Sequence, residues 1–244
     1  MHSHRRLLLL PLLSALLLTA AAGWRAEAQT RTRPVKEADL SKAVPASGFK
    51  RRGTAPALLF NLRFKQMQPG VSTHTPTVFV QKGGGWVVPT LPGDFEQTGW
   101  VFAGRAPDRR EVWGITEIDV EGRGPDLELL SSRDGGLTWR HYTLKKVSSY
   151  AVFKSLHMTP RGRGALTIEL SPDDAQIENK PSIKAGFYTY TTRDGGRTWT
   201  RKGRYSATEP TEPPGRLDPH DVSYDDTEPP GAARLREIMR ELAR

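Results

Sequence analysis

The chain of 244 residues contains no cysteine, which excludes a disulfide framework, a lipoprotein anchor and a cysteine-ligated metal site. Histidine is scarce as well, and the six histidines are scattered without the spacing of a metal site. There is no Gly-x-Ser-x-Gly motif, which would place a serine nucleophile on a sharp turn. We therefore expect no metal and no cofactor, and a fold that is held together by its apolar core alone.

Long apolar runs are absent beyond the N-terminus. The chain begins with basic residues, continues with an apolar stretch at Leu7–Ala22, and reaches the small-residue site Ala26-Glu27-Ala28. This order is typical of an export signal that is cleaved after Ala28. The apolar stretch is short for a membrane anchor, which needs about 20 residues. The sequence thus predicts a secreted or periplasmic protein with a signal peptide at residues 1–28 and no stable membrane span.

Positive charge is distributed unevenly along the chain. The formal net charge is +9, of which residues 29–207 carry +11 and residues 208–231 carry −6. Outside the cytoplasm, a basic body favours an anionic glycan, a cell-envelope polymer or lipid headgroups over nucleic acid. The alternative is a solvated, arginine-rich surface that binds nothing. The acidic segment could also fold back onto the basic body.

Composition divides the mature chain into four segments. We expect a flexible basic arm at 29–54, a β domain at 55–207, an acidic, proline-rich linker at 208–231 and an amphipathic helix at 232–244. In the linker, a cluster of acidic and histidine side chains could hold a divalent cation, namely Asp218, His220, Asp221, Asp225 and Asp226. The surrounding prolines favour a solvated chain instead.

The C-terminal helix is predicted from a single apolar stripe. Leu235, Ile238, Met239 and Leu242 have the spacing of one helix face. A helix this short is marginal by itself, so the stripe must dock on another surface. We expect it to pack on the β domain; a partner protein or a membrane surface is the alternative.

An internal repeat is the most informative feature of the β domain. The pattern [S/T]-x-D-x-G-x-T-W occurs twice, each time between two β-like runs. The first copy contains Ser132, Asp134, Gly136, Thr138 and Trp139, and the second contains Thr192, Asp194, Gly196, Thr198 and Trp199. Each copy is therefore predicted to form the turn of a β-hairpin.

The residue types suit such a turn. An aspartate at its start can accept hydrogen bonds from backbone N–H groups further along the chain. The paired glycines supply positive φ angles. The threonine hydroxyl can bond back into the turn, and the tryptophan covers the hairpin with a large apolar surface.

This pattern resembles the Asp-box, or BNR repeat, of the sialidase superfamily and related β-propellers. In that family the box joins the third and fourth strands of a blade and is structural. The resemblance implies an all-β fold of antiparallel, blade-like four-stranded sheets in a small or incomplete β-propeller, with the short C-terminal helix added. Residues 55–207 hold about three blades, whereas closure usually needs at least four. The sheets could stay open, pair as a homo-oligomer, or form a smaller β architecture.

The resemblance also suggests an enzymatic alternative. A sialidase of this superfamily uses three arginines, a Tyr–Glu pair and an aspartic acid, with one arginine in an F/Y-R-I-P motif. The nearest sequence here, Asn61-Leu62-Arg63-Phe64, lacks the leading aromatic residue and the proline. The other candidates carry no distinguishing motif: Arg105, Arg163, Tyr188, Tyr190, Glu117 and Glu169.

Two functional hypotheses follow. The first is an exported, non-catalytic Asp-box β protein that binds an anionic glycan, a cell-envelope polymer or a protein partner. The alternative is a sialidase-type exo-glycoside hydrolase.

Overall fold

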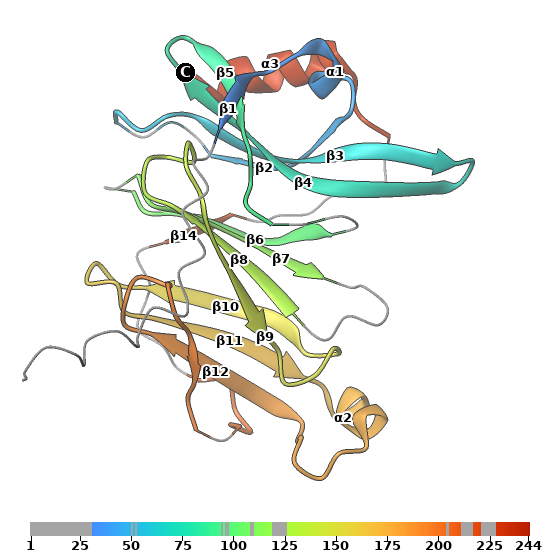
Figure 1. Ribbon diagram of the computed structural model, residues 1–244, viewed down its shortest axis with the longest axis vertical. Helices are drawn as coiled ribbons and strands as arrows, with labels where there is room; N and C mark the ends of the chain where they lie inside the picture. The colour runs from blue at the N-terminus through green and yellow to red at the C-terminus, as the bar shows by residue number, and fades with distance from the viewer. Residues whose placement is uncertain are drawn as a thin grey trace, which may run out of the picture.

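Three antiparallel sheets are stacked face to face, with a helical layer at one end of the stack (Figure 1). The computed structural model describes residues 31–49, 51, 53–93, 95, 98–107, 110–118, 126–203, 205–210, 217–220 and 228–244. The predicted signal peptide lies outside these residues. The mostly β architecture confirms the predicted fold class, and the described sheets do not close into a barrel.

Each sheet contains an antiparallel meander of four consecutive strands, and two of the sheets gain one more strand. The first sheet has the order β1 (Thr32–Pro34), β5 (Gly85–Pro89), β4 (Val71–Lys82), β3 (Leu58–Gln68), β2 (Ala43–Phe49). The second has β14 (Asp218–His220), β6 (Gly99–Arg105), β7 (Val112–Ile118), β8 (Asp126–Ser132), β9 (Arg140–Lys145). The third has β10 (Val152–Met158), β11 (Gly164–Leu170), β12 (Gly186–Thr192), β13 (Thr200–Arg201).

The three meanders share a detail that the sequence does not reveal. The first strand of each meander carries a register shift at its junction with the second strand. The shifts lie between Pro45 and Ser47 in β2, between Trp100 and Phe102 in β6, and between Phe153 and Ser155 in β10. A bulge bends a strand and increases its local twist. The first sheet therefore follows the same plan as the other two, although it lacks the repeated [S/T]-x-D-x-G-x-T-W motif.

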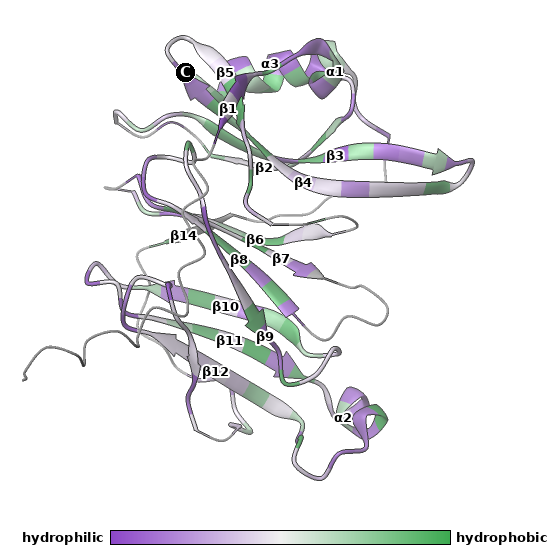
Figure 2. Cartoon of the chain, in the orientation of Figure 1, coloured by the Kyte–Doolittle hydropathy of each residue, from purple (hydrophilic) through white to green (hydrophobic). Residues whose placement is uncertain are grey.

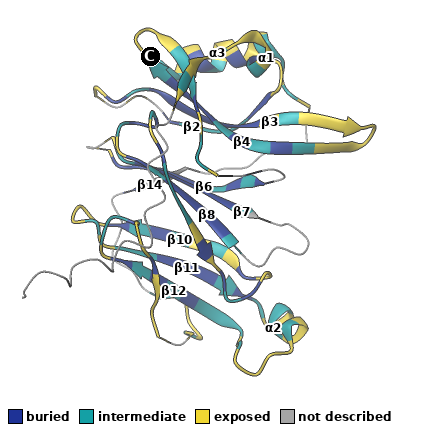
Figure 3. Cartoon of the chain, viewed as in Figure 1, coloured by how far each residue is buried: buried dark blue, intermediate teal, exposed yellow. Residues whose placement is uncertain are grey.

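Successive side chains along each strand point to opposite faces of the sheet, and this alternation divides the core into layers. In β3, Leu58, Phe60 and Leu62 face the second sheet, whereas Leu59 faces the helical layer. This is the period of two that a strand with apolar neighbours on both faces requires. Hydrophobic and buried residues accordingly run along the middle of all three sheets (Figures 2 and 3).

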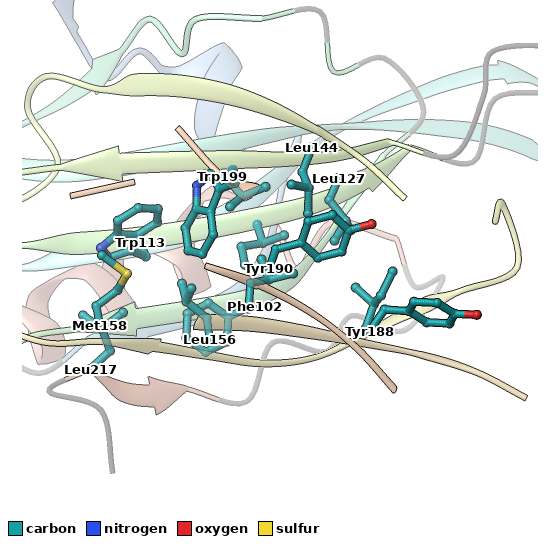
Figure 4. Close-up of a cluster of buried hydrophobic side chains, with 14 of the residues drawn as sticks. Phe102, Trp113, Leu127, Leu144, Leu156, Met158, Tyr188, Tyr190, Trp199 and Leu217 are labelled. Carbon is teal, nitrogen blue, oxygen red and sulfur yellow. The ribbon is translucent and has the colours of Figure 1, made fainter. Parts of the chain in front are cut away.

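The layer between the second and third sheets is rich in aromatic side chains (Figure 4). Trp113 of β7 meets Trp199 of the second box edge to face, with ring centroids 6.4 Å apart. Tyr188 and Tyr190 of β12 point into the same layer. Large buried rings contribute most of the burial energy of such an interface.

The flexible arm predicted for residues 29–54 is wrong for its described part. β1 pairs with β5, β2 pairs with β3, and the short helix α1 (Glu37–Leu40) lies between β1 and β2. The sequence hides these elements because β1 is very short and because Pro45 and the bulge interrupt the period of β2. Leu40 and Phe49 nevertheless become buried, since their partners are supplied by distant parts of the chain.

The acidic linker also contributes to the fold. Its residues Asp218–His220 form β14, which pairs with β6 at the edge of the second sheet. Pro219 is tolerated there because an edge strand can lack one backbone donor. Leu217 just before it is buried in the aromatic layer. The remaining acidic residues of the cluster noted above, among them Asp221, lie outside the described residues.

The C-terminal helix α3 (Ala232–Leu242) docks on the first sheet, as predicted. Leu235 and Met239 are buried against Leu59 and Phe79. A Cβ at Gly48 would lie 2.9 Å from a methyl carbon of Leu242, so β2 forms part of this docking surface. Together with α1, the helix covers the outer face of the first sheet, where another sheet would have to pack if the stack continued (Figure 1). None of the described helices combines the length and apolar character that crossing a membrane requires.

Candidate functional site

The first copy of the repeated motif, which we call the first box, forms the β8–β9 turn through its aspartate. Asp134 Oδ1 accepts hydrogen bonds from the backbone N–H groups of Leu137 (3.0 Å) and Thr138 (2.8 Å). The Thr138 hydroxyl donates to Asp134 Oδ2 at 2.7 Å. Gly135 and Gly136 have φ angles of +78° and +96°, in the region that favours glycine. The turn is thus held by its own side chains.

The first residue of the box has a role that the sequence analysis missed. The Ser132 hydroxyl donates to Asp134 Oδ1 at 2.8 Å and accepts the Gly136 N–H at 2.7 Å. Thr192 does the same in the second box, with distances of 2.8 Å and 3.0 Å. The signal was the hydroxyl residue at this position in both copies, because one hydroxyl oxygen can donate a hydrogen bond and accept another.

The second box repeats the network in the β12–β13 turn. Asp194 Oδ1 accepts the N–H groups of Arg197 and Thr198, both at 3.0 Å, and Asp194 Oδ2 accepts the Thr198 hydroxyl at 2.6 Å. Partial burial raises the pKa of Asp194, but the hydrogen bonds from Thr198 and Thr192 outweigh it, so the pKa lies below its ordinary value. The carboxylate is therefore ionised and engaged inside the turn.

Each box also packs on the sheet that precedes it. A Cβ at Gly136 would lie 2.4 Å from a methyl carbon of Leu58 in the first sheet, and a Cβ at Gly196 would lie 2.2 Å from the Trp113 ring in the second. Trp139 and Trp199 enter the same two interfaces. The boxes thus join neighbouring sheets as well as neighbouring strands.

Arginines gather along the edge that the boxes form. We call Arg110, Arg133, Arg161, Arg163 and Arg193 the arginine rim; all five are exposed. They lie in the β6–β7, β8–β9, β10–β11 and β12–β13 loops, which come together at the left edge in Figure 1.

Backbone contacts hold these loops side by side. The Gly135 N–H donates to the Arg110 carbonyl, and the Gly195 N–H donates to the Gly162 carbonyl, both at 2.8 Å. A Cβ at Gly195 would lie 2.5 Å from Arg133 Nη2, so the first box reaches the second. Because the box carboxylates are engaged within their turns, they do not project from the rim as free acceptors.

The candidate catalytic residues do not converge. Arg105 is buried at the end of β6, whereas Arg163 is exposed in the arginine rim. Tyr188 and Tyr190 face the second sheet, and their hydroxyls donate to the backbone carbonyls of Lys184 (2.6 Å) and Lys145 (3.1 Å). Burial raises the pKa of Tyr190. Neither hydroxyl is bonded to any of the glutamates that the structure describes, so no Tyr–Glu pair is formed from these residues.

The two candidate glutamates are engaged elsewhere. Glu117 of β7 forms an ion pair with the buried Lys146, and Glu169 of β11 pairs with Lys154 at 2.9 Å. Glu169 lies between Ile168 and Leu170, which face the aromatic layer, so its side chain is on the opposite face of the sheet.

Metal ligands do not assemble either: the part of the chain that the structure describes holds no group of three His, Cys, Asp or Glu side chains suited to a metal ion.

Comparison with family models, curated proteins and solved structures finds no match to this chain. The interpretation of the boxes therefore depends on the two motifs and their geometry.

Proposed function

We propose that this chain is an exported, non-catalytic Asp-box protein whose arginine rim binds an anionic glycan or cell-envelope polymer. The observation that carries the proposal is the placement of five exposed arginines on four adjoining loops. The boxes order the β8–β9 and β12–β13 loops of the rim before any ligand arrives. Less conformational entropy is then lost on binding than with mobile loops.

Guanidinium groups suit the anionic groups of such polymers. Arginine pairs with carboxylate, sulfate or phosphate through two parallel N–H bonds, and it remains charged at any physiological pH. A single exposed ion pair contributes only about 0.2–1 kcal/mol, so the affinity must come from several arginines acting on one chain. A polymer that repeats its charge supplies that multiplicity, whereas a small anion does not.

Binding to immobilised heparin and alginate tests the proposal, because they carry sulfate and carboxylate groups respectively. We expect retention that falls as salt rises, since exposed charges are screened. The double variant Arg133→Gln, Arg193→Gln should weaken binding about tenfold, the effect of two surface ion pairs. The matched control Lys65→Gln, Lys82→Gln removes the same charge from exposed positions of the first sheet and should bind as the parent does.

Three results would contradict the proposal. Equal losses in the two double variants would show that net charge acts without a site. Binding to an acidic protein but to neither polysaccharide would assign the rim to a protein partner. Release of a fluorogenic sialoside by the pure protein, lost on mutation of Tyr190, would establish the enzymatic alternative.

A further inference from the structure

A gap opens in the first sheet, away from the arginine rim. The ladder between β4 and β5 ends at Val80↔Val87, and β5 then continues along β1 with Arg33 opposite Val88. Among the described residues, Thr75–Phe79 of β4 consequently have no strand beside them on the β5 side. The gap belongs to a pocket of about 340 Å³ that also reaches Asn61 and Arg63 of β3. This volume lies at the small end of the range for ligand sites, about 300–1,000 Å³.

Asn61 is the unusual residue of this pocket. Its side chain is fully buried, and Oδ1 has no hydrogen-bond partner among the described residues. Its Nδ2 reaches the Leu59 carbonyl only at 3.5 Å. Its backbone carbonyl accepts the Trp100 indole N–H at 3.0 Å, which holds the position from the second sheet. An unpaired buried acceptor costs about 1–3 kcal/mol, so a donor supplied by a ligand would recover that energy.

The other walls offer complementary groups. Arg63, two residues along the same face of β3, is exposed and can donate. Arg33 and Asp39 form an ion pair of 2.5 Å, and Thr75 and Thr77 add half-buried hydroxyls. Apolar surface comes from side chains such as Phe79, Val88 and Leu91. A buried acceptor, the Arg63 guanidinium, the Arg33–Asp39 ion pair, two hydroxyls and an apolar surface thus line a space of about 340 Å³.

We propose that this pocket binds one N-acetylated hexosamine unit. The acetamido N–H donates to Asn61 Oδ1, the acetamido carbonyl accepts from Arg63, and the methyl group packs on the apolar wall at Phe79. Ring hydroxyls pair with Thr75 and Thr77. The site is separate from the arginine rim and does not depend on the function proposed for it.

Saturation-transfer NMR and calorimetry with N-acetylglucosamine test the site, with glucose as the sugar that lacks the acetamido group. We expect the parent to bind N-acetylglucosamine about tenfold more tightly than glucose, the contribution of a hydrogen bond to a buried acceptor. Asn61→Leu should abolish this preference while the protein melts no lower than the parent, because it removes an unpaired polar group. Equal affinity for the two sugars, or binding of neither, would overturn the proposal.

A second pair of variants tests the proposed sugar site if Asn61→Leu does not fold. Arg63→Gln should weaken binding of N-acetylglucosamine severalfold, whereas Lys65→Gln, on the same strand but outside the pocket, should leave it unchanged. Equal affinities in these two variants would also refute the site. The rim variant Arg133→Gln, Arg193→Gln should bind the sugar as the parent does, so the two proposals fail separately.

Discussion

The two boxes have nearly the same internal hydrogen bonds and very different surroundings. In both, the aspartate accepts two backbone N–H groups and one threonine hydroxyl within 3.0 Å. The first box, however, rests on the aliphatic side chain of Leu58, and the second rests on the ring of Trp113. The turn is therefore a local property of the motif, and the neighbouring sheet decides how tightly it is held.

The box tryptophans show the same contrast. The Trp139 indole N–H donates to the Gly136 carbonyl at 2.7 Å, so this side chain completes its own turn. The Trp199 Nε1 is buried without a hydrogen-bond partner among the described residues. Trp199 gains the edge-to-face contact with Trp113, while Trp139 has a similar contact with Phe60 at 6.2 Å. The second box thus relies more on packing and less on hydrogen bonds.

The largest expected effect comes from the box glycines. Gly136→Ala and Gly196→Ala each place a Cβ at positive φ and against a neighbouring sheet. We expect a loss of about 2–4 kcal/mol in the free energy of unfolding, which combines backbone strain with overpacking. The Gly196 variant should lose more, because an indole ring yields less than a leucine methyl. Urea denaturation of both variants measures the difference.

Gly84→Ala is the matched control for the glycine variants. Gly84 has a φ of +81°, but a Cβ there would meet no heavy atom within 4 Å. Its loss should be about 1–2 kcal/mol, the cost of backbone strain alone. If all three variants lost the same stability, the packing of the boxes on their neighbouring sheets would contribute nothing.

The next effect concerns the box aspartates. Asp134→Ala and Asp194→Ala should each lower the free energy of unfolding by about 1–3 kcal/mol, because turn donors lose their acceptor. The two losses should be similar, since the two networks are the same. The exposed Asp173 in α2 (Pro172–Glu178) provides the control, because its replacement by alanine should cost only a few tenths of a kcal/mol. Unchanged melting curves in both box variants would refute this role.

The lowered pKa of Asp194 also predicts how the stability of the protein depends on pH. Because its folded-state pKa lies below its ordinary value, its contribution to stability is complete above the unfolded pKa of about 3.9. That contribution is lost as the pH falls through the folded pKa. Asp194→Asn should therefore lose less stability than the parent between neutral pH and the acid range below 4. Parallel profiles of melting temperature against pH would exclude this linkage.

The smallest effect distinguishes the tryptophans. Trp139→Phe removes an indole N–H that is bonded to Gly136, whereas Trp199→Phe removes one that has no partner in the described part of the chain. Both variants lose packing volume, but Trp139→Phe should cost about 1 kcal/mol more, the net value of a buried hydrogen bond. Thermal unfolding followed by fluorescence measures both. A larger loss for Trp199→Phe would show that ring packing outweighs the hydrogen bond.

The alternation of apolar and polar residues was sufficient to predict strands that are long and whose partner strands are close along the chain. The β-like runs Glu111–Ile118 and Ala165–Leu170, for example, form β7 and β11, whose ends lie within one residue of the ends of the runs. This alternation does not reveal β1 and β14, each three residues long, because a strand so short has no measurable period. Both are edge strands that exist only because a distant strand offers them a partner.

The candidate sites were less accessible to sequence reasoning. An excess of arginine was evident, but its concentration on one edge depends on contacts such as that of Arg133 with Gly195, from two different sheets. The pocket combines Asn61 with Arg33 from the segment interpreted as a flexible arm. The spacing of these residues along the sequence does not predict that they lie close together. Their strands are brought together because β4 and β5 pair between them.

The sequence by itself determined the chemistry that is local. The box motif specifies its turn because the aspartate, the hydroxyl residue and the glycines satisfy one another within a few residues. The C-terminal stripe similarly specifies one apolar helix face. Tertiary structure decided which sheet each box supports, where the helix docks and which polar side chain is left unpaired. These outcomes depend on apolar burial and strand pairing between distant segments, whose energy is defined only once the partners have met.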